Sequence, residues 1–277
     1  MRGNLFKIIP MLVLIFSLTS CVQSTPSEAN YPGSKAAEKK QDKEGKPLGL
    51  VVSAASSLTD ALNDIAKDYN SKNPEINITF NFGSSGALQK QIEQGAPADI
   101  FFSAAERQIT ELDKKGLILE GTKTELLENR IVLVIPKGEI APLSFEALNS
   151  SSVKKLALGE PNSVPIGQYS QEILKYLKIF ENLKSGNKLV YAGDARQVLA
   201  WVESGNANAG LVYESDAIKS RKAAIVAYAP RDSHEPVKYP AAVIKTSKNP
   251  KLAKEFIRFL SLPESSEVFK AYGFITK

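Results

Sequence analysis

Apolar runs rich in β-branched residues alternate along this chain with segments of helical periodicity, and this alternation is the feature that most limits its fold. In the first part of the chain the order is strand, helix, strand, helix, strand. Such an order predicts a parallel sheet with right-handed crossovers. The expected elements are strands at 48–55 and 76–82, helices at about 58–72 and 85–94, and a third apolar run at 98–104.

The pattern restarts after a further strand at 131–136. Strands are expected at 155–158, 188–191 and 210–213, and helices at 166–177 and 195–203. Two α/β lobes fit this order better than one continuous sheet. The stretch 237–244 is expected to return to the first lobe, followed by helices at about 250–260 and 264–271. We therefore predict an α/β fold in which 48–130 and 237–277 form lobe I and 131–236 form lobe II.

The N-terminal segment has the features of an export signal. Cys21 is the only cysteine, so it cannot form an internal disulfide, and it follows the apolar run 8–16 and the small residues Thr19 and Ser20. That run is too short to cross about 30 Å of hydrocarbon, which needs about 20 apolar residues. The pattern resembles the lipobox of bacterial lipoproteins. By that resemblance 1–20 is a signal peptide and Cys21 becomes a diacylglyceryl-modified N-terminus at the extracytoplasmic face of the membrane. The alternative is a buried free cysteine after an ordinary signal.

Residues 21–47 are polar and charged and are expected to form a flexible tether below the lipidated cysteine. Without 1–47, the net charge of +5 falls to about +2. No basic stripe interleaved with aromatic residues is present, so nucleic acid is not an expected partner. No later segment is long and apolar enough to span a membrane. We expect the folded part to be a monomer that needs no cofactor.

Three strand-to-helix junctions carry small or hydroxyl residues. They are Ser56-Ser57, the stretch 83–86 (GSSG) and 193–195 (GDA). Each offers unpaired backbone N–H groups and the positive end of a helix dipole, which together bind anions. In open α/β sheets such junctions line the ligand crevice, so several could converge on one small anion. The alternative is ordinary helix capping, because serine is a preferred N-cap residue.

Several segments of the chain closely resemble the molybdate-binding proteins of ABC transporters, in the same order and spacing. The likeness covers essentially all of 48–277, and that family has the type II periplasmic-binding-protein fold, two α/β lobes joined by crossing strands with the oxyanion between them. The segments are 54–61 (AASSLTDA), 82–86 (FGSSG), 91–100 (QIEQGAPADI), 159–161 (GEP), 164–167 (VPIG), 210–217 (GLVYESDA), 232–234 (DSH), 239–243 (YPAAV) and 272–274 (YGF).

The resemblance implies a ligand site and a transport role. Ser57 and Ser85 would donate hydroxyl and backbone hydrogen bonds from lobe I. Ile166 and Ala195 would donate backbone N–H groups from lobe II, and Tyr213 its hydroxyl. The ligand would be molybdate, and also tungstate, delivered to an ABC permease, with molybdenum bound only as its oxyanion and no direct metal site. The family often has alanine at the position of Ile166 and valine at that of Ala195, which leaves the size of the cleft near Ile166 open.

Other functions remain as alternatives. A binding protein for sulfate, phosphate or an organic acid would share the fold. A secreted serine hydrolase would use Ser57 or Ser85 with His234, but the Gly-x-Ser-x-Gly elbow is absent. His234 is the only histidine and cannot form a multi-histidine metal site, so a structural or solvated role is expected. Trp201 is expected to pack in the core, and Arg196 to be solvated or ion-paired between the lobes rather than bound to the ligand.

Overall fold

The computed structural model describes residues 48–140 and 142–277. The predicted signal peptide, Cys21 and the predicted tether lie outside the described residues. Within the described part, none of the helices has both the length and the apolar character needed to cross a bilayer.

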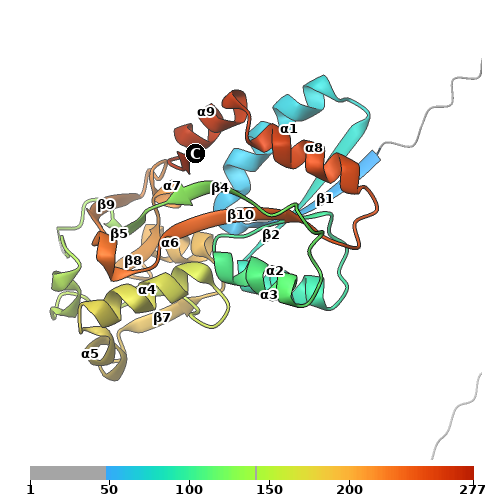
Figure 1. Ribbon diagram of the computed structural model, residues 1–277. Helices are drawn as coiled ribbons and strands as arrows, with labels where there is room; N and C mark the ends of the chain where they lie inside the picture. Colours follow the sequence, from blue (N-terminus) through green and yellow to red (C-terminus); the bar gives the residue numbers. More distant parts are fainter. Residues whose placement is uncertain (1–47, 141) are drawn as a thin grey trace, which may run out of the picture. The chain divides into compact units, whose positions relative to one another are not determined.

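The first sheet has six strands in the order β11-β4-β10-β3-β1-β2 (Figure 1). The central strand β1 runs parallel to both β2 and β3, as the β-α-β-α-β pattern predicts, whereas β10 pairs antiparallel with β3 and β4. We call the part of the chain built on this sheet lobe I. Its strands are β1 (Leu48–Ala55), β2 (Ile76–Gly83), β3 (Ile100–Phe102), β4 (Thr124–Asn129), β10 (Val237–Val243) and β11 (Ile275–Thr276).

The second sheet has five strands in the order β7-β6-β8-β5-β9, and we call the part built on it lobe II. Strand β6 is parallel to β7 and β8, and β5 is antiparallel to β8 and β9. The strands are β5 (Ile131–Pro136), β6 (Leu156–Gly159), β7 (Leu189–Ala192), β8 (Ala209–Tyr213) and β9 (Ala223–Tyr228). The two-lobe α/β fold predicted from the sequence is therefore present.

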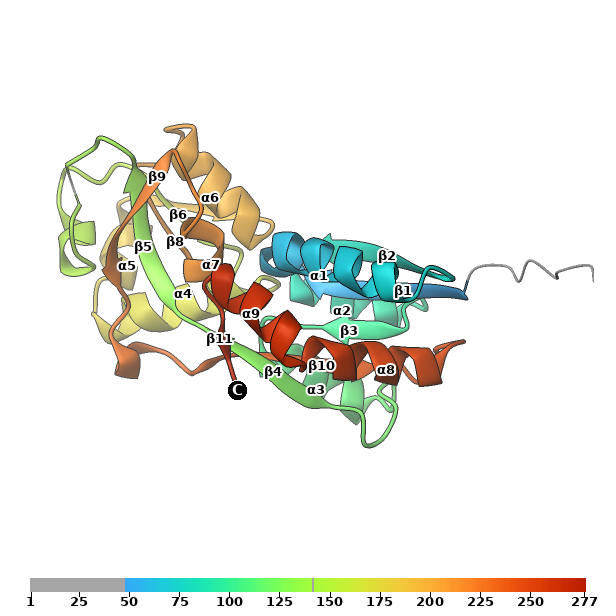
Figure 2. The ribbon, with the colours of Figure 1, turned by 90° about the horizontal axis from the view of Figure 1, so that it is seen from above.

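Helices cover both faces of each sheet, because successive strand side chains point to opposite faces. In lobe I, Phe101 packs with α2 and α3, whereas its neighbours Ile100 and Phe102 pack on the side of α1 and α8 (Figures 1 and 2). In lobe II, α4 and α6 cover opposite faces in the same way. The helices are α1 (Thr59–Lys72), α2 (Ser85–Glu93), α3 (Glu106–Lys114), α4 (Pro165–Tyr176), α5 (Phe180–Ser185), α6 (Ala195–Glu203), α7 (Glu214–Ala217), α8 (Pro250–Leu260) and α9 (Pro263–Ala271), with 3₁₀ turns at Ser56–Leu58, Glu146–Asn149 and Arg231–Ser233.

Two crossing segments join the lobes. Strand β4 continues into β5 through the single residue Arg130, and 229–236 connects β9 to β10 (Figure 2). The Arg130 guanidinium donates to both carboxylate oxygens of Glu214, at 2.6 and 2.9 Å, and the Tyr228 hydroxyl donates to the same carboxylate at 2.8 Å. Since Glu214 is buried, this bidentate ion pair braces the point where the chain changes lobes.

The sequence-based elements agree with the structure apart from a few differences. The run 98–104 contains only the three-residue strand β3, although Asp99 and Ser103 on either side of it still form backbone hydrogen bonds to neighbouring strands. The helices α3, α5 and α7 and the strands β4, β9 and β11 were not predicted.

Candidate functional site

The five residues singled out in the sequence line one cavity between the lobes. Ser57 and Ser85 come from lobe I, and Ile166, Ala195 and Tyr213 come from lobe II. The cavity is small, with a free volume of about 10 Å³. No residue of this lining carries a charge; it consists of Ala55, Ser56, Ser57, Gly83, Ser84, Ser85, Ala104, Val164, Pro165, Ile166, Ala195 and Tyr213.

The two neighbouring serines of the GSSG stretch have different roles. The Oγ of Ser84 accepts a 3.3 Å hydrogen bond from the backbone N–H of Ala87, so Ser84 is the N-cap of α2. The Oγ of Ser85 accepts from the backbone N–H of Ala104 at 3.0 Å. Ser85 is fully buried, and its hydroxyl proton has no acceptor among the described residues. Capping therefore accounts for Ser84, and Ser85 keeps a proton to donate into the cavity.

Ser57 lies in the 3₁₀ turn between β1 and α1. Its Oγ is 2.9 Å from the phenolic oxygen of Tyr239, a fully buried residue of β10. The Asn129 side chain, at the end of β4, also donates to that phenolic oxygen, at 3.3 Å. Sequence reasoning missed Tyr239 and Asn129, because Tyr239 meets Ser57, and Asn129 meets Tyr239, only once the hinge strands have folded.

Lobe II presents the first turns of two helices. Ile166 follows Pro165 at the start of α4, and Ala195 is the first residue of α6. Backbone N–H groups in a first turn have no intrahelical acceptor and carry the positive end of the helix dipole. Asp194 caps α6 by accepting from the N–H of Gln197 at 2.9 Å. Ile166 and Ala195 are thus placed to donate backbone hydrogen bonds.

The side chain of Ile166 is fully buried and packs toward β6. A Cβ on Gly159 would lie 2.9 Å from Cγ2 of Ile166 and 2.7 Å from Cγ1 of Val164. A Cβ on Gly167 would lie 2.2 Å from the carbonyl oxygen of Gly159. The lack of a side chain at Gly159 leaves room for the side chains of Ile166 and Val164, and the lack of one at Gly167 lets the start of α4 approach the end of β6.

Tyr213 ends β8 and is 1% exposed. Its hydroxyl is buried and has no hydrogen-bond partner among the described residues. Burial raises the pKa of Tyr213 well above its usual value, so the hydroxyl keeps its proton. A buried, unpaired hydroxyl costs about 1–3 kcal/mol, which a bound acceptor would recover.

Contacts between the lobes surround the cavity. The backbone N–H of Gly86 donates to the carbonyl oxygen of Ser163 at 3.1 Å. The Arg196 guanidinium pairs with the Asp60 carboxylate, joining α6 to α1. Arg196 is therefore an ion-pairing residue between the lobes, one of the two roles expected for it.

The other residues weighed in the sequence lie apart from this cavity. Nδ1 of His234 is 2.7 Å from the backbone oxygen of Glu235, and its ring meets that of Tyr169 edge-on. Within the described chain, no three His, Cys, Asp or Glu residues are grouped to hold a metal ion. Trp201 is partly buried against the core cluster that contains Val198 and Val202, so it packs as predicted.

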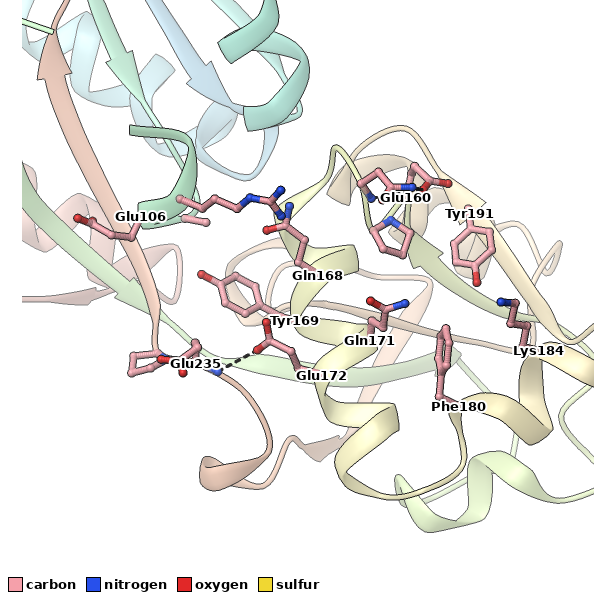
Figure 3. Close-up of a pocket in the computed structure, with 15 residues that line it drawn as sticks. Glu106, Glu160, Gln168, Tyr169, Gln171, Glu172, Phe180, Lys184, Tyr191 and Glu235 are labelled. Atoms are coloured by element: carbon pink, nitrogen blue, oxygen red, sulfur yellow. Dashed lines mark hydrogen bonds between the residues drawn. The ribbon is translucent and has the colours of Figure 1, made fainter. Parts of the chain in front are cut away.

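A second, larger pocket of about 600 Å³ lies beside α4 and α5 (Figure 3). Four carboxylates line it, against the two basic residues Arg107 and Lys184. One carboxylate, Glu172, accepts a 3.0 Å hydrogen bond from the backbone N–H of Glu235. This excess of negative charge does not suit an anion, so the small uncharged cavity is the better candidate for anion binding. The four carboxylates belong to Glu106, Glu160, Glu172 and Glu235.

Known proteins with similar sequences and structures include transport components. Residues 50–275 match the family of bacterial extracellular solute-binding proteins. A Bacillus subtilis protein provisionally named an ABC transporter substrate-binding lipoprotein is 48% identical, over 83% of this chain and 87% of its own length. The molybdate-binding protein ModA of Haemophilus influenzae is 38% identical, over 82% of this chain and 90% of its own length. The solved periplasmic molybdate-binding protein of Azotobacter vinelandii has a TM-score of 0.76 at 24% identity, covering 82% of this chain and 99% of that one.

Proposed function

This chain belongs to the bacterial extracellular solute-binding proteins, in the family of molybdate-binding proteins of ABC transporters, and we propose that it binds molybdate, and also tungstate, between its lobes and delivers it to an ABC permease. One observation carries the proposal. Hydroxyl and backbone N–H donors from both lobes converge on one buried, uncharged cavity, and the Tyr213 hydroxyl there has no partner among the described residues.

The proposed ligand shell consists of neutral donors. Ser57, Ser85 and Tyr213 donate hydroxyl protons, and Ile166 and Ala195 donate backbone N–H groups. Hydrogen bonds to a charged acceptor are about twice as strong as neutral ones, and the helix dipoles at α4 and α6 add to them. A dianion is therefore held by oriented dipoles without a cationic side chain that would attract anions of any shape.

Selection among anions follows from size and protonation. Hydrogen phosphate carries a proton that a shell of donors leaves unpaired, at a cost of about 1–3 kcal/mol. Sulfate carries no proton, so only its smaller radius counts against it. Tungstate has nearly the size of molybdate and should bind almost as well.

Binding requires the lobes to move. Every residue of the cavity lining except Gly83 is buried, so the arrangement of the lobes seen here leaves a ligand little access from solvent. The ligand therefore enters with the lobes apart and is enclosed as the crossing segments at Arg130 and 229–236 bend. Because each lobe supplies part of the shell, the ligand favours the closed arrangement by its extra contacts there.

In the cell, the proposed protein is a monomer anchored through a lipid on Cys21 at the outer face of the membrane, with 1–20 removed and 21–47 as a tether. It carries out no reaction on the ligand. The division into lobe I (48–130 and 237–277) and lobe II (131–236) describes the two bodies that move. A relative named as a lipoprotein supports the anchor.

The proposal can be tested by the metal content of the purified chain. Cells expressing it are grown with added molybdate, and molybdenum per protein is measured by elemental mass spectrometry. We expect about one molybdenum per chain, and much less in a Ser57→Ala, Ser85→Ala, Tyr213→Phe triple variant that keeps its folded circular dichroism spectrum. Equal molybdenum in both proteins would contradict the site, and none in the parent would contradict the function.

A further inference from the structure

We infer that Asn129 and Tyr239 are positioning residues that fix the direction of the hydrogen bond at Ser57, so that the site rejects oxyanions carrying a proton. The inference rests on the proposed function and adds a specificity mechanism to it. It starts from a chain of three buried side chains that begins at the hinge and ends at the cavity: Asn129, Tyr239 and Ser57.

The orientation of the Asn129 amide is set by its neighbours. The backbone N–H of Arg130 donates to Oδ1 of Asn129 at 2.8 Å, which identifies that atom as the oxygen. Nδ2 is therefore the donor, and it lies 2.8 Å from Oγ of Ser215 in lobe II and 3.3 Å from the phenolic oxygen of Tyr239. An amide nitrogen donates but does not accept, so the chain begins with a donor.

Tyr239 has one proton and two hydrogen-bond partners among the described residues. Since Asn129 can only donate, the proton of Tyr239 has Ser57 Oγ as its acceptor, at 2.9 Å. Tyr239 is fully buried, and burial raises the pKa of its hydroxyl well above the usual value, so the proton stays in place. The Asn129 N–H and the Tyr239 proton therefore both have acceptors only when Asn129 donates to Tyr239 and Tyr239 donates to Ser57.

Ser57 then has its own proton left for the cavity. Ser85 has the same arrangement, because the Ala104 N–H donates to its Oγ. Suppose instead that an anion donated a proton to Ser57 and that Ser57 donated to Tyr239. The hydrogen bonds from Asn129 to Ser57 would then have to run in the opposite direction. The Tyr239 proton would then face the Asn129 N–H and have no acceptor. A buried donor left unpaired in this way costs about as much as the discrimination expected against hydrogen phosphate.

The test measures the dissociation constants of molybdate, sulfate and phosphate at pH 7 for the full chain and its variants. Asn129→Asp keeps the shape of the side chain but places an acceptor beside Tyr239, so the hydrogen bonds between residue 129, Tyr239 and Ser57 can run in either direction. Tyr239→Phe removes both the donor to Ser57 and the acceptor that the reversed direction needs, and it keeps the ring, which packs edge-on against Tyr213 and Phe274. In Asn129→Asp we expect the phosphate-to-molybdate ratio of dissociation constants to fall about tenfold, the equivalent of one hydrogen bond to a charged group. Tyr239→Phe leaves the Ser57 proton without an acceptor when the anion donates, so it should keep the ratio of the parent.

Sulfate and a remote tyrosine provide the controls. Sulfate has no proton, so the ratio of its dissociation constant to that of molybdate should stay constant, even if the new carboxylate of Asn129→Asp weakens the binding of all anions. Tyr272→Phe, which removes a hydrogen bond to Asp64 outside the cavity, should change neither ratio. In a Ser57→Ala background, Asn129→Asp should no longer lower the phosphate ratio.

The outcomes separate this inference from the proposed function. A phosphate-to-molybdate ratio that is unchanged in folded Asn129→Asp protein, or one that falls as much in Tyr239→Phe, would overturn the inference and leave the proposed function intact. If Asn129→Asp does not fold, Tyr239→Phe decides: the ratio of the parent supports the inference, and a fall of about tenfold overturns it. A parent chain that binds no molybdate would overturn the proposed function itself.

Discussion

The backbone N–H of Gly86 in lobe I donates a 3.1 Å hydrogen bond to the carbonyl oxygen of Ser163 in lobe II, and a Cβ on Gly86 would lie only 2.3 Å from that oxygen. Atoms at that distance cannot both stay in place. A glycine at position 86 is therefore what allows α2 to meet the loop before α4 beside the cavity.

Gly86→Ala is expected to weaken molybdate binding by about 1–3 kcal/mol, the usual cost of forcing an extra carbon into a packed contact, because the lobes can no longer meet fully. Titration calorimetry measures the change. Gly49→Ala is the matched control, since its Cβ would have no atom within 4 Å, and it should bind as the parent does. Parent-like affinity in Gly86→Ala would show that the Gly86–Ser163 contact is not needed for binding.

Tyr213→Phe is expected to affect folding and binding in opposite directions. Because the hydroxyl has no partner among the described residues, its loss should leave the free energy of unfolding unchanged or raise it by up to about 1 kcal/mol. Affinity for molybdate should fall by about 1–3 kcal/mol. Thermal unfolding with and without molybdate measures both, with Tyr272→Phe as a control that loses stability but not affinity. A Tyr213→Phe protein that binds molybdate normally would exclude this hydroxyl from the site.

Arg196→Ala is expected to have a small effect. Arg196 and Asp60 are both about half exposed, and such surface pairs contribute about 0–1 kcal/mol. Affinity should fall less than about fivefold, with a smaller effect at high salt, and Arg196→Ala should add little in an Asp60→Ala background. Titrations at two salt concentrations check this. A loss as large as that of Tyr213→Phe would instead indicate that Arg196 contacts the anion.

Asp216 is expected to make stability depend on pH. Its Oδ2 is buried without a partner in the described chain, and burial raises the pKa of Asp216 to about 7, with the charges of Asp194 and Asp60 acting in the same direction and Arg196 opposing them. An unfolded aspartate titrates at about 4, so between these values the folded chain holds more protons and the Asp216 contribution to stability falls as pH rises. The free energy of unfolding of Asp216→Asn, measured relative to that of the parent, should therefore increase as the pH rises from about 4 to 7. Above about pH 7 the difference between the two proteins should stay constant.

Denaturant unfolding of both proteins at several pH values measures this difference. A stability difference that does not change between pH 4 and 8 would show that Asp216 titrates normally. The charge of Asp216 also acts on the hydroxyls of Tyr213 and Tyr239, so the parent should bind a dianion less tightly as pH rises through 7, and Asp216→Asn should not.

Periodicity predicted the two-lobe α/β fold because most strands and helices here follow a clear apolar pattern. Periodicity did not predict strand β4, because its leucines, Leu126 and Leu127, are adjacent rather than alternating and are flanked by Glu125 and Glu128. The strand depends on its partners: it pairs with β10 and β11, and Glu125 forms an ion pair with Lys238 at 3.0 Å. Such tertiary contacts cannot be seen in a local window of sequence.

The junction pattern identified where an anion could bind but not which serine of a pair would face it. Ser84 and Ser85 differ only in their contacts, and the decisive one for Ser85 is with Ala104, 19 residues away. Tyr239 is separated from Ser57 by 182 residues, so no local pattern could link them. The proposed roles of Ser57, Ser85, Ile166, Ala195 and Tyr213 came from the family resemblance, and the structure shows that all five line one cavity.

The measurement that tests the central claim most directly is a calorimetric titration of the purified chain with molybdate, tungstate, sulfate and phosphate at one pH and ionic strength. We predict tight one-to-one binding of molybdate and tungstate, with weak or no binding of sulfate and phosphate. Binding of none of the four, or a preference for sulfate or phosphate, would contradict the proposed function, and the fit of the ligand beside Ile166 would be the first feature to re-examine.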